Sequence, residues 1–491
     1  MSDMELLLGN LPDLPPDDVV AHVTPWHKAM KRILTGFALT SITLNFFYLN
    51  YILPTVGMML ILLGFRALRK ENRYFGCCYI LSVLRFVLLA VTLVMDTTIF
   101  FHRFDMTCAI VSGVMLLVTY ICFANGLKEL QIKAEMPVNV KSATGLAVWY
   151  TALFLLALVE YRGYIVALGM LVMYVLIIRG LYKTAREIGE AGYAVKAVRV
   201  KMTDTAIVLT AVCLMLTATF FGYTFGCSYP MKWQPLQVKT DHSIEKIKNN
   251  LLDLGFPEGI LKDISDEDIS ACEGAVSVVV DSRDFPVNEG REITEYRVGE
   301  NGEGWYVDTV YDTKELRLTG IAVKLSGDRE TWKLFHHFQW VAPHNKAGTE
   351  SIQLWPAYRA YSGWLKGSDV SGQVLCDIDG ETYVSDYYFL GNKTYTSQSI
   401  FFGERTSTDV FAEFSMNKKG ENHRGYLSYA ISVSQEGYII DSWINYTHQK
   451  HLLQYPAKTA AEKRMTSGFS SEGAFITIQD ALQMHDGKSI S

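Results

Sequence analysis

Histidine and tryptophan gather in one short stretch of the chain, TWKLFHHFQWVAPH at residues 331–344. Imidazole side chains can ligate a metal ion or transfer a proton near neutral pH. Adjacent residues of a β-strand point to opposite faces, so His336 and His337 cannot easily hold one ion. We therefore expect no metal or other cofactor here, with His336 buried between aromatic rings, His337 on the outer face, and His344 in a loop.

A second group of candidate site residues is aromatic and follows this stretch. The segment LWPAYRAYSGW (354–364) contains four closely spaced rings, Trp355, Tyr358, Tyr361 and Trp364. Exposed tryptophan and tyrosine rings can stack on sugars, whereas buried rings fill a core or cover its rim. The first arrangement predicts a glycan-binding surface, and the second predicts packing alone.

Two polar residues lie inside long apolar segments, Arg85 in ILSVLRFVLLAV and Asn45 in the run 33–65. A charged side chain at the centre of a bilayer costs roughly 3 kcal/mol or more on insertion scales. Arg85 could bind an anion or relay a proton, or it could donate hydrogen bonds to Asn45 or to carbonyls freed by Pro54. No second buried charge accompanies Arg85, which favours the structural interpretation.

The remaining candidate chemistry is less specific. Acidic residues that could form the carboxylate pair of a glycoside hydrolase are Asp369, Asp377, Asp386 and Glu404. DIDGE (377–381) carries only part of a calcium loop and fits a hairpin turn. Cys272 and Cys376 are candidates for a disulfide if their half of the chain lies outside the cell. No GxSxG motif marks a nucleophile, so binding is favoured over catalysis.

Charge and hydropathy divide the 491 residues into two halves. Residues 1–226 hold 19 Lys plus Arg and 14 Asp plus Glu, a net charge of +5. Subtracting these from totals of 45 and 51 leaves 26 basic and 37 acidic residues in 227–491, a net charge of −11. An acidic, aromatic-rich half argues against nucleic acid as a partner, because phosphates need basic surface.

The first half predicts an α-helical polytopic membrane domain, because its apolar runs match the thickness of a bilayer core. The clear runs are 74–95, 107–125, 143–160, 163–182 and 205–225. The run 33–65 is flanked by basic residues on both sides, so we expect it to cross twice and turn near Asn50–Pro54. This makes seven transmembrane helices within residues 33–226.

The distribution of basic residues predicts the orientation of these helices. The loops assigned to the cytoplasm hold fifteen Lys and Arg, and the short outer loops hold only Arg103 and Arg162. Cytoplasmic loops of membrane proteins are enriched in basic residues. We therefore expect segment 1–32 in the cytoplasm and the chain after residue 227 outside a cell (plasma) membrane. The cytoplasmic segments are too short for a signalling domain, so signal output would need a membrane or cytoplasmic partner protein.

A short helical unit is expected at residues 243–275. Its apolar residues recur at helical spacing, Gly255 fits a helix end, and Ser265 fits a helix N-cap. The stretch LLDLGFP resembles the leucine–glycine–phenylalanine turn of ubiquitin-associated three-helix domains. That resemblance implies the helical geometry only, because an outside location excludes ubiquitin binding.

Residues 276–455 alternate between apolar and polar side chains, which predicts an all-β antiparallel sandwich, jelly-roll-like, of nine or ten strands. Hairpins are expected at Gly-Asp (327–328), Asp-Gly (379–380), 417–425 and Glu-Gly (436–437). NKT (392–394) and NYT (445–447) are glycosylation sequons if the chain enters a eukaryotic secretory route. Segment 456–491 is expected to be a tail with a short helix and a disordered end.

These observations together predict a multi-pass membrane protein that displays an extracellular β-sandwich for ligand binding or sensing. A glycan bound by the aromatic group is the most specific form of this hypothesis. The alternatives are a transporter or membrane-embedded enzyme built around Arg85, and an extracellular glycoside hydrolase.

Overall fold

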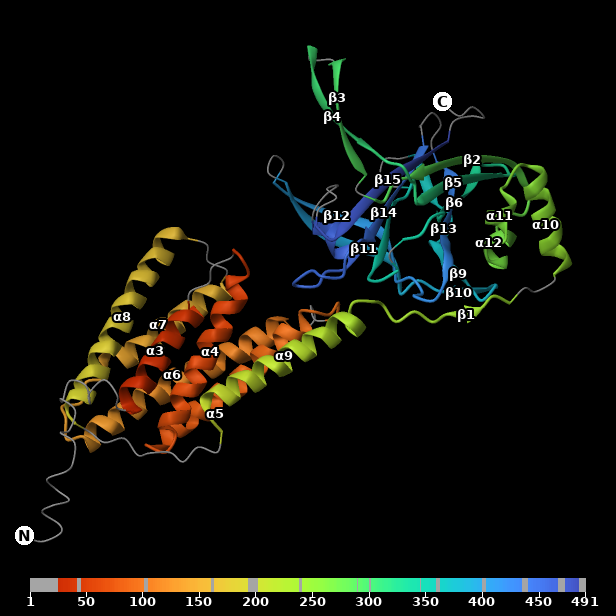
Figure 1. Ribbon diagram of the computed structural model, residues 1–491. Helices are drawn as coiled ribbons and strands as arrows, with labels where there is room; N and C mark the ends of the chain where they lie inside the picture. The colour runs from red at the N-terminus through yellow and green to blue at the C-terminus, as the bar shows by residue number, and fades with distance from the viewer. Residues whose placement is uncertain are drawn as a thin grey trace, which may run out of the picture. The chain divides into compact units, whose positions relative to one another are not determined.

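Helices come first along the chain and strands follow (Figure 1). The computed structural model describes residues 25–41, 46–100, 105–159, 163–192, 202–237, 241–288, 290–299, 302–344, 346–358, 363–399, 403–434, 440–466 and 473–484. The chain divides into a helical unit, Met1–Asp96 with Phe100–Phe221, and a β-rich unit, Thr97–Ile99 with Gly222–Ser491.

Long apolar helices form the first part of the described chain. They are α3 (Pro25–Ser41), α4 (Leu49–Leu68), α5 (Arg73–Met95), α6 (Asp105–Lys133), α7 (Lys141–Leu158), α8 (Tyr164–Glu190) and α9 (Asp204–Gly226). Six of them, α4 to α9, are long and apolar enough to cross a bilayer, with mean hydropathies between 1.4 and 2.4 over their best windows. The chain therefore has the helices of a multi-pass membrane protein.

The turn between α3 and α4 comes earlier than the sequence predicts. Phe47 and Tyr48 have φ angles of 48° and 59°, and α4 begins directly after them, so the expected turn at Asn50–Pro54 is wrong. Pro54 lies inside α4. As the sixth residue of the helix it lies beyond the first turn, so its missing N–H removes one intrahelical hydrogen bond.

Two close contacts explain how α3, α4 and α9 pack. A Cβ atom on Gly36 of α3 would lie 2.6 Å from the Gly57 carbonyl of α4, so the two backbones touch where side chains are absent. The carboxylate of Asp204, the first residue of α9, accepts from Arg32 and Arg66, each at 2.7 Å. The start of α9 therefore contacts the middle of α3 and the C-terminal end of α4.

Antiparallel strands build the second part of the chain. They are β1 (Gln234–Pro235), β2 (Ala275–Phe285), β3 (Arg291–Gly299), β4 (Gly302–Val310), β5 (Leu316–Leu325), β6 (Thr331–Trp340), β7 (Glu350–Trp355), β8 (Trp364–Lys366), β9 (Ser371–Ile378), β10 (Glu381–Ser385), β11 (Phe389–Ser399), β12 (Gly403–Phe414), β13 (Glu421–Val433), β14 (Ile440–Gln449) and β15 (Phe475–Met484). An eight-stranded sheet has the order β1-β10-β9-β13-β6-β5-β2, with β8 also paired to β13. A five-stranded sheet has the order β11-β12-β7-β14-β15, and β3-β4 form a separate two-stranded ribbon.

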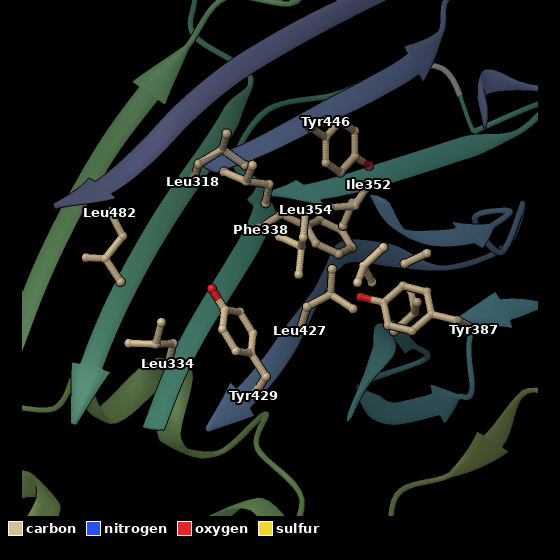
Figure 2. Close-up of a cluster of buried hydrophobic side chains, with 14 of the residues drawn as sticks. Leu318, Leu334, Phe338, Ile352, Leu354, Tyr387, Leu427, Tyr429, Tyr446 and Leu482 are labelled. Atoms are coloured by element: carbon tan, nitrogen blue, oxygen red, sulfur yellow. The ribbon is translucent and has the colours of Figure 1, made fainter. Parts of the chain in front are cut away.

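The two larger sheets share one hydrophobic core (Figure 2). Phe338 of β6 stacks against Phe414 of β12, with ring centroids 5.3 Å apart, and lies 5.2 Å from the ring of Tyr446 on β14. Leu427 from β13 and Leu354 from β7 are fully buried in the same core. Burial of one such side chain stabilises a fold by about 1.5–3 kcal/mol.

Three short helices, named here the helical cap, cover the other face of the eight-stranded sheet (Figure 1). They are α10 (His242–Asp253), α11 (Glu258–Leu261) and α12 (Asp266–Ser270), so the expected small helical unit is confirmed. Gly255, with φ of 96°, ends α10, and the Ser265 hydroxyl accepts from the Asp268 amide at the start of α12. Phe256 packs edge-on against Phe335 of β6 at 5.7 Å.

Some strand pairings differ from those predicted. The hairpins at 327–328 and 379–380 are confirmed, because β5 pairs with β6 and β9 with β10. The expected hairpins at 417–425 and 436–437 are wrong, because β13 lies in one large sheet and β12 and β14 lie in the other. Alternating hydrophobicity predicts that a segment is a strand but does not select its neighbour.

Several elements lie outside the sequence prediction. The β3-β4 ribbon projects from the β-rich unit (Figure 1), and β7 occupies the centre of the five-stranded sheet. Strand β15 pairs with β14 over ten residues, so the expectation of a disordered end is wrong for residues 475–484. Helix α13 (Ala460–Thr466) precedes it, as expected for a short helix in this segment.

Candidate functional site

The predicted aromatic binding group is largely part of the core. Trp364 is 5% exposed, and Tyr358 packs edge-on against Tyr429 at 5.4 Å. The Trp355 indole is half-buried and donates to the Asp409 carboxylate at 3.1 Å. Tyr361 lies outside the described residues. The three described rings therefore do not form one exposed platform for a sugar.

The two adjacent histidines point to opposite faces of the eight-stranded sheet, as predicted. His336 lies in the core with its Nε2 atom 2.7 Å from the Ser442 hydroxyl. Burial lowers the pKa of His336 to about 4. His337 lies on the other face, where its Nε2 atom is 3.0 Å from Asp263 of the helical cap. The alternation of a strand separates the two rings, and each is only 2% exposed.

Asp263 connects the cap to two strands of the sheet. Its Oδ2 atom faces His337 of β6, and its Oδ1 atom accepts from Arg424 Nε of β13 at 2.7 Å. A second arm of Arg424 donates to Asp377 of β9 at 3.0 Å. The carboxylates of Asp263 and Asp377 raise the pKa of Arg424 despite its burial. This network holds the segment around Asp263 against the eight-stranded sheet.

Asp268 makes a second buried connection between the cap and the sheet. Its carboxylate accepts from Lys333 Nζ and the Ser371 hydroxyl, each at 2.7 Å, and from the Tyr426 hydroxyl at 2.8 Å. Burial alone would raise the pKa of this carboxyl, but Lys333 and the two hydroxyls hold it below its usual range. A buried ion pair persists when hydrogen bonds satisfy its remaining atoms, and here they do.

A cleft of about 1530 Å³ opens between the helical cap and this sheet face. Its floor comes from six strands and presents amide, hydroxyl and charged side chains: Ser282, Arg317, Thr319, His337, Gln339, Gln373, Thr382, Asn422 and Arg424. Its other walls come from the cap and from residues 234–237. No aromatic side chain other than His337 lines it among the residues that the structure describes.

The charges along the cleft are balanced within the protein. Arg317 pairs with Asp284 at 2.7 Å, and Arg424 pairs with Asp263. The two cap lysines that line the cleft also form ion pairs, Lys248 with Asp266 at 3.5 Å and Lys262 with Glu258 at 2.8 Å. The cleft therefore offers hydrogen-bonding groups rather than a net charge of one sign.

The intramembrane and cysteine predictions have different outcomes. Arg85 is 4% exposed inside the helical unit, whereas Asn45 lies outside the described residues. Cys272 and Cys376 are free thiols, so the structure does not contain the bridge considered between them. The Cys272 thiol donates to the Asp268 carbonyl in the cap, and burial raises the pKa of both thiols, to about 12 and about 11.

The acidic residues considered for hydrolysis have varied surroundings. Asp377 is bound by Arg424, Asn422 and Thr382, which hold its pKa below the usual range against the opposing effect of burial. Asp369 is 92% exposed beside Lys366. Asp379 and Gly380, with φ angles of 52° and 85°, form the hairpin turn predicted for DIDGE.

Sequence reasoning did not identify most of the cleft residues. Gln339, Gln373 and Asn422 come from β6, β9 and β13, which are far apart along the chain. The polar residues alternating within these strands were the available signal, but they became one surface only through strand pairing. Only His337, on the outer face of its strand, was placed correctly in advance.

No protein-family model matches the sequence, and a search of curated proteins found no match.

Proposed function

We propose that this is a multi-pass membrane protein whose β-rich unit binds a polar, uncharged ligand of the glycan class in the cleft under the helical cap. The observation that carries the proposal is the cleft of about 1530 Å³, whose floor is lined by side-chain amides and hydroxyls. Such groups donate and accept hydrogen bonds with sugar hydroxyls. The volume exceeds the usual range of about 300–1,000 Å³ for small-molecule sites, which favours an extended ligand.

Charge pairing supports an uncharged ligand. The four cationic side chains that line the cleft, Lys248, Lys262, Arg317 and Arg424, all have carboxylate partners. An anionic ligand would have to compete with these carboxylates, and Arg424, the most buried of the four cations, would lose its counter-ion. A polyhydroxylated ligand can bind through hydrogen bonds without breaking any of these ion pairs. This replaces the aromatic surface of residues 355–364 as the favoured binding site.

The proposed topology follows from the loop charges. Seven helices, α3 to α9, cross a plasma membrane with the N-terminus in the cytoplasm, and the β-rich unit lies outside. Support comes from the fifteen basic residues in the loops assigned to the inside against two outside. The shared core of the two larger sheets supports an interpretation of the β-rich unit as a β-sandwich. A signal produced by ligand binding would be passed to a membrane or cytoplasmic partner protein.

Glycan-array binding of the full-length protein in nanodiscs tests the proposal. Gln339 and Asn422 contact each other at 2.9 Å on the cleft floor. The double variant Gln339→Leu/Asn422→Gly removes both amides and keeps every charged residue, and glycine tolerates the φ of 48° at residue 422. We expect at least a tenfold loss of affinity for the retained glycan. The matched control is Asn392→Leu, an exposed amide on β11, which should bind normally. Absence of retention across a broad panel, or equal binding by the double variant, contradicts the proposal.

A further inference from the structure

Arg85 points into the helical unit from the middle of α5. The buried residues of that helix, Phe75, Cys78, Ser82 and Arg85, recur at spacings of three and four and so form one inner stripe. Arg85 is the thirteenth residue of the 23 in α5. At 1.5 Å per residue, the guanidinium lies about 15 Å or more along the helix from either end. Its side chain is 4% exposed.

Two of the three nitrogen donors of Arg85 are buried and have no acceptor in the described part of the chain. Its Nε and Nη1 atoms are buried without a hydrogen-bond partner. Two phenol side chains lie close enough to interact with the Arg85 charge, Tyr120 of α6 and Tyr150 of α7. The Tyr120 hydroxyl is itself buried without a hydrogen bond, although Ser41 lies nearby. Arg85 and Tyr120 therefore present several unmet donors to one location.

No carboxylate of the described residues balances this charge. Arginine keeps its charge in proteins, so the guanidinium cannot become neutral by losing a proton. An isolated buried ion costs several kcal/mol, and arginines in this unit otherwise avoid that cost, as Arg32 and Arg66 do by sharing Asp204. Within the part of the chain that the structure describes, the Arg85 guanidinium therefore has no counter-ion.

We propose that Arg85, with the hydroxyls of Tyr120 and Tyr150, binds a small monovalent anion such as chloride inside the helical unit. The surrounding packing favours a small anion over a lipid phosphate. The Tyr120 and Tyr150 rings meet edge-on at 5.5 Å, and a Cβ atom on Gly113 would lie 3.3 Å from the Tyr150 hydroxyl. The site is separate from the cleft of the β-rich unit and does not depend on the ligand of that cleft.

Chloride binding by the full-length protein in neutral phosphatidylcholine nanodiscs tests this inference. Chloride should raise the Tm saturably relative to gluconate at equal ionic strength, and bound chloride should broaden the ³⁵Cl resonance. Arg85→Gln should weaken the apparent affinity at least tenfold and remove the broadening. The matched control is Arg179→Gln, which changes an exposed arginine of α8 and should leave both signals unchanged.

A second variant decides the outcome if Arg85→Gln does not fold. Tyr120→Phe removes one hydroxyl and keeps the ring, so it should fold and weaken chloride binding severalfold. The proposal is overturned if wild type shows no saturable chloride response, or if Arg85→Gln responds as wild type does. It is also overturned if Tyr120→Phe binds as wild type where Arg85→Gln does not fold, or if only anionic lipid, at any chloride concentration, stabilises the protein.

Discussion

At the residue scale, buried polar side chains that have few possible hydrogen-bond partners hold the β-rich unit in one arrangement. His336 is the clearest case, because it lies in an apolar core with one hydrogen bond, to the Ser442 hydroxyl at 2.7 Å. The same hydroxyl interacts with Tyr429 from β13. A neutral imidazole fits this core, whereas an imidazolium would lose its hydration without gaining a carboxylate.

We predict that the free energy of unfolding of the β-rich unit falls as pH decreases from about 7 to 4. Burial lowers the pKa of His336 to about 4 from an ordinary value of 6.5, so the unfolded state binds the proton first. Its contribution is present above pH 6.5 and is lost as pH falls toward 4, by roughly 3 kcal/mol at most. Tryptophan-fluorescence denaturation curves of the full-length protein at several pH values measure it.

The control for this prediction is His336→Gln, which cannot take up a proton in this range. Its stability should be lower at pH 7, and its stability should decrease less steeply between pH 7 and 4. A smaller decrease remains, because burial also lowers the pKa values of His344 and His423 to about 4. Identical slopes for the variant and wild type would falsify the assignment to His336.

At the element scale, the helical cap is attached to the sheet by two carboxylates as well as by hydrophobic contacts. Asp263 and Asp268 both reach across to β6 and β13, and each is at most 5% exposed. The cap also covers one side of the proposed binding cleft. The attachment of the cap therefore controls both the stability of this sheet face and the shape of the cleft.

We predict that Asp268→Asn destabilises the β-rich unit by about 3–5 kcal/mol, because Lys333 keeps a buried charge with no anion beside it. Lys333 is 3% exposed, so water cannot replace the lost carboxylate. Hydrogen–deuterium exchange should rise across α10 to α12. The matched control is Asp266→Asn, a partly exposed residue two positions away whose lysine partner is 3.5 Å distant, and it should change stability by less than about 1 kcal/mol. Equal exchange in the two variants would argue against a structural role for Asp268.

At the scale of the whole molecule, the sequons report on topology. Asn392 is exposed on β11, whereas Asn445 is fully buried on β14 and donates to the Gln353 side chain at 3.0 Å. An oligosaccharide fits only on the exposed residue of the folded unit. Glycosylation also requires that the unit enter the secretory lumen, which is the compartment equivalent to the cell exterior.

We predict that the protein, expressed in a eukaryotic secretory system, carries a glycan at Asn392 and none at Asn445. The measurement is the mass shift on treatment with an endoglycosidase, with peptide mapping to assign the site. Asn392→Gln should abolish the shift and leave folding intact. An unmodified Asn392 in correctly folded, membrane-inserted protein would contradict an external β-rich unit.

The sequence alone predicted the elements whose signal is local. Apolar runs of bilayer length predicted the six candidate spans of α4 to α9, Gly255 predicted the end of α10, and strand alternation predicted the opposite orientations of His336 and His337. In each case the residues that carry the signal are close neighbours along the chain. Periodicity of 3.6 or 2 residues is enough to assign a helix face or a strand face.

Only the tertiary structure decided which strands pair and which polar residues meet. β13 lies beside β6 and β9 rather than beside its chain neighbours β12 and β14, and β15 adds to β14 across an intervening helix. These pairings bury Trp364, pack the partly buried Tyr358 against the core, and bring Gln339, Gln373 and Asn422 to one cleft floor. Strand alternation leaves each segment two faces and several acceptable partners, and the choice among them depends on how side chains distant in sequence fill a common core.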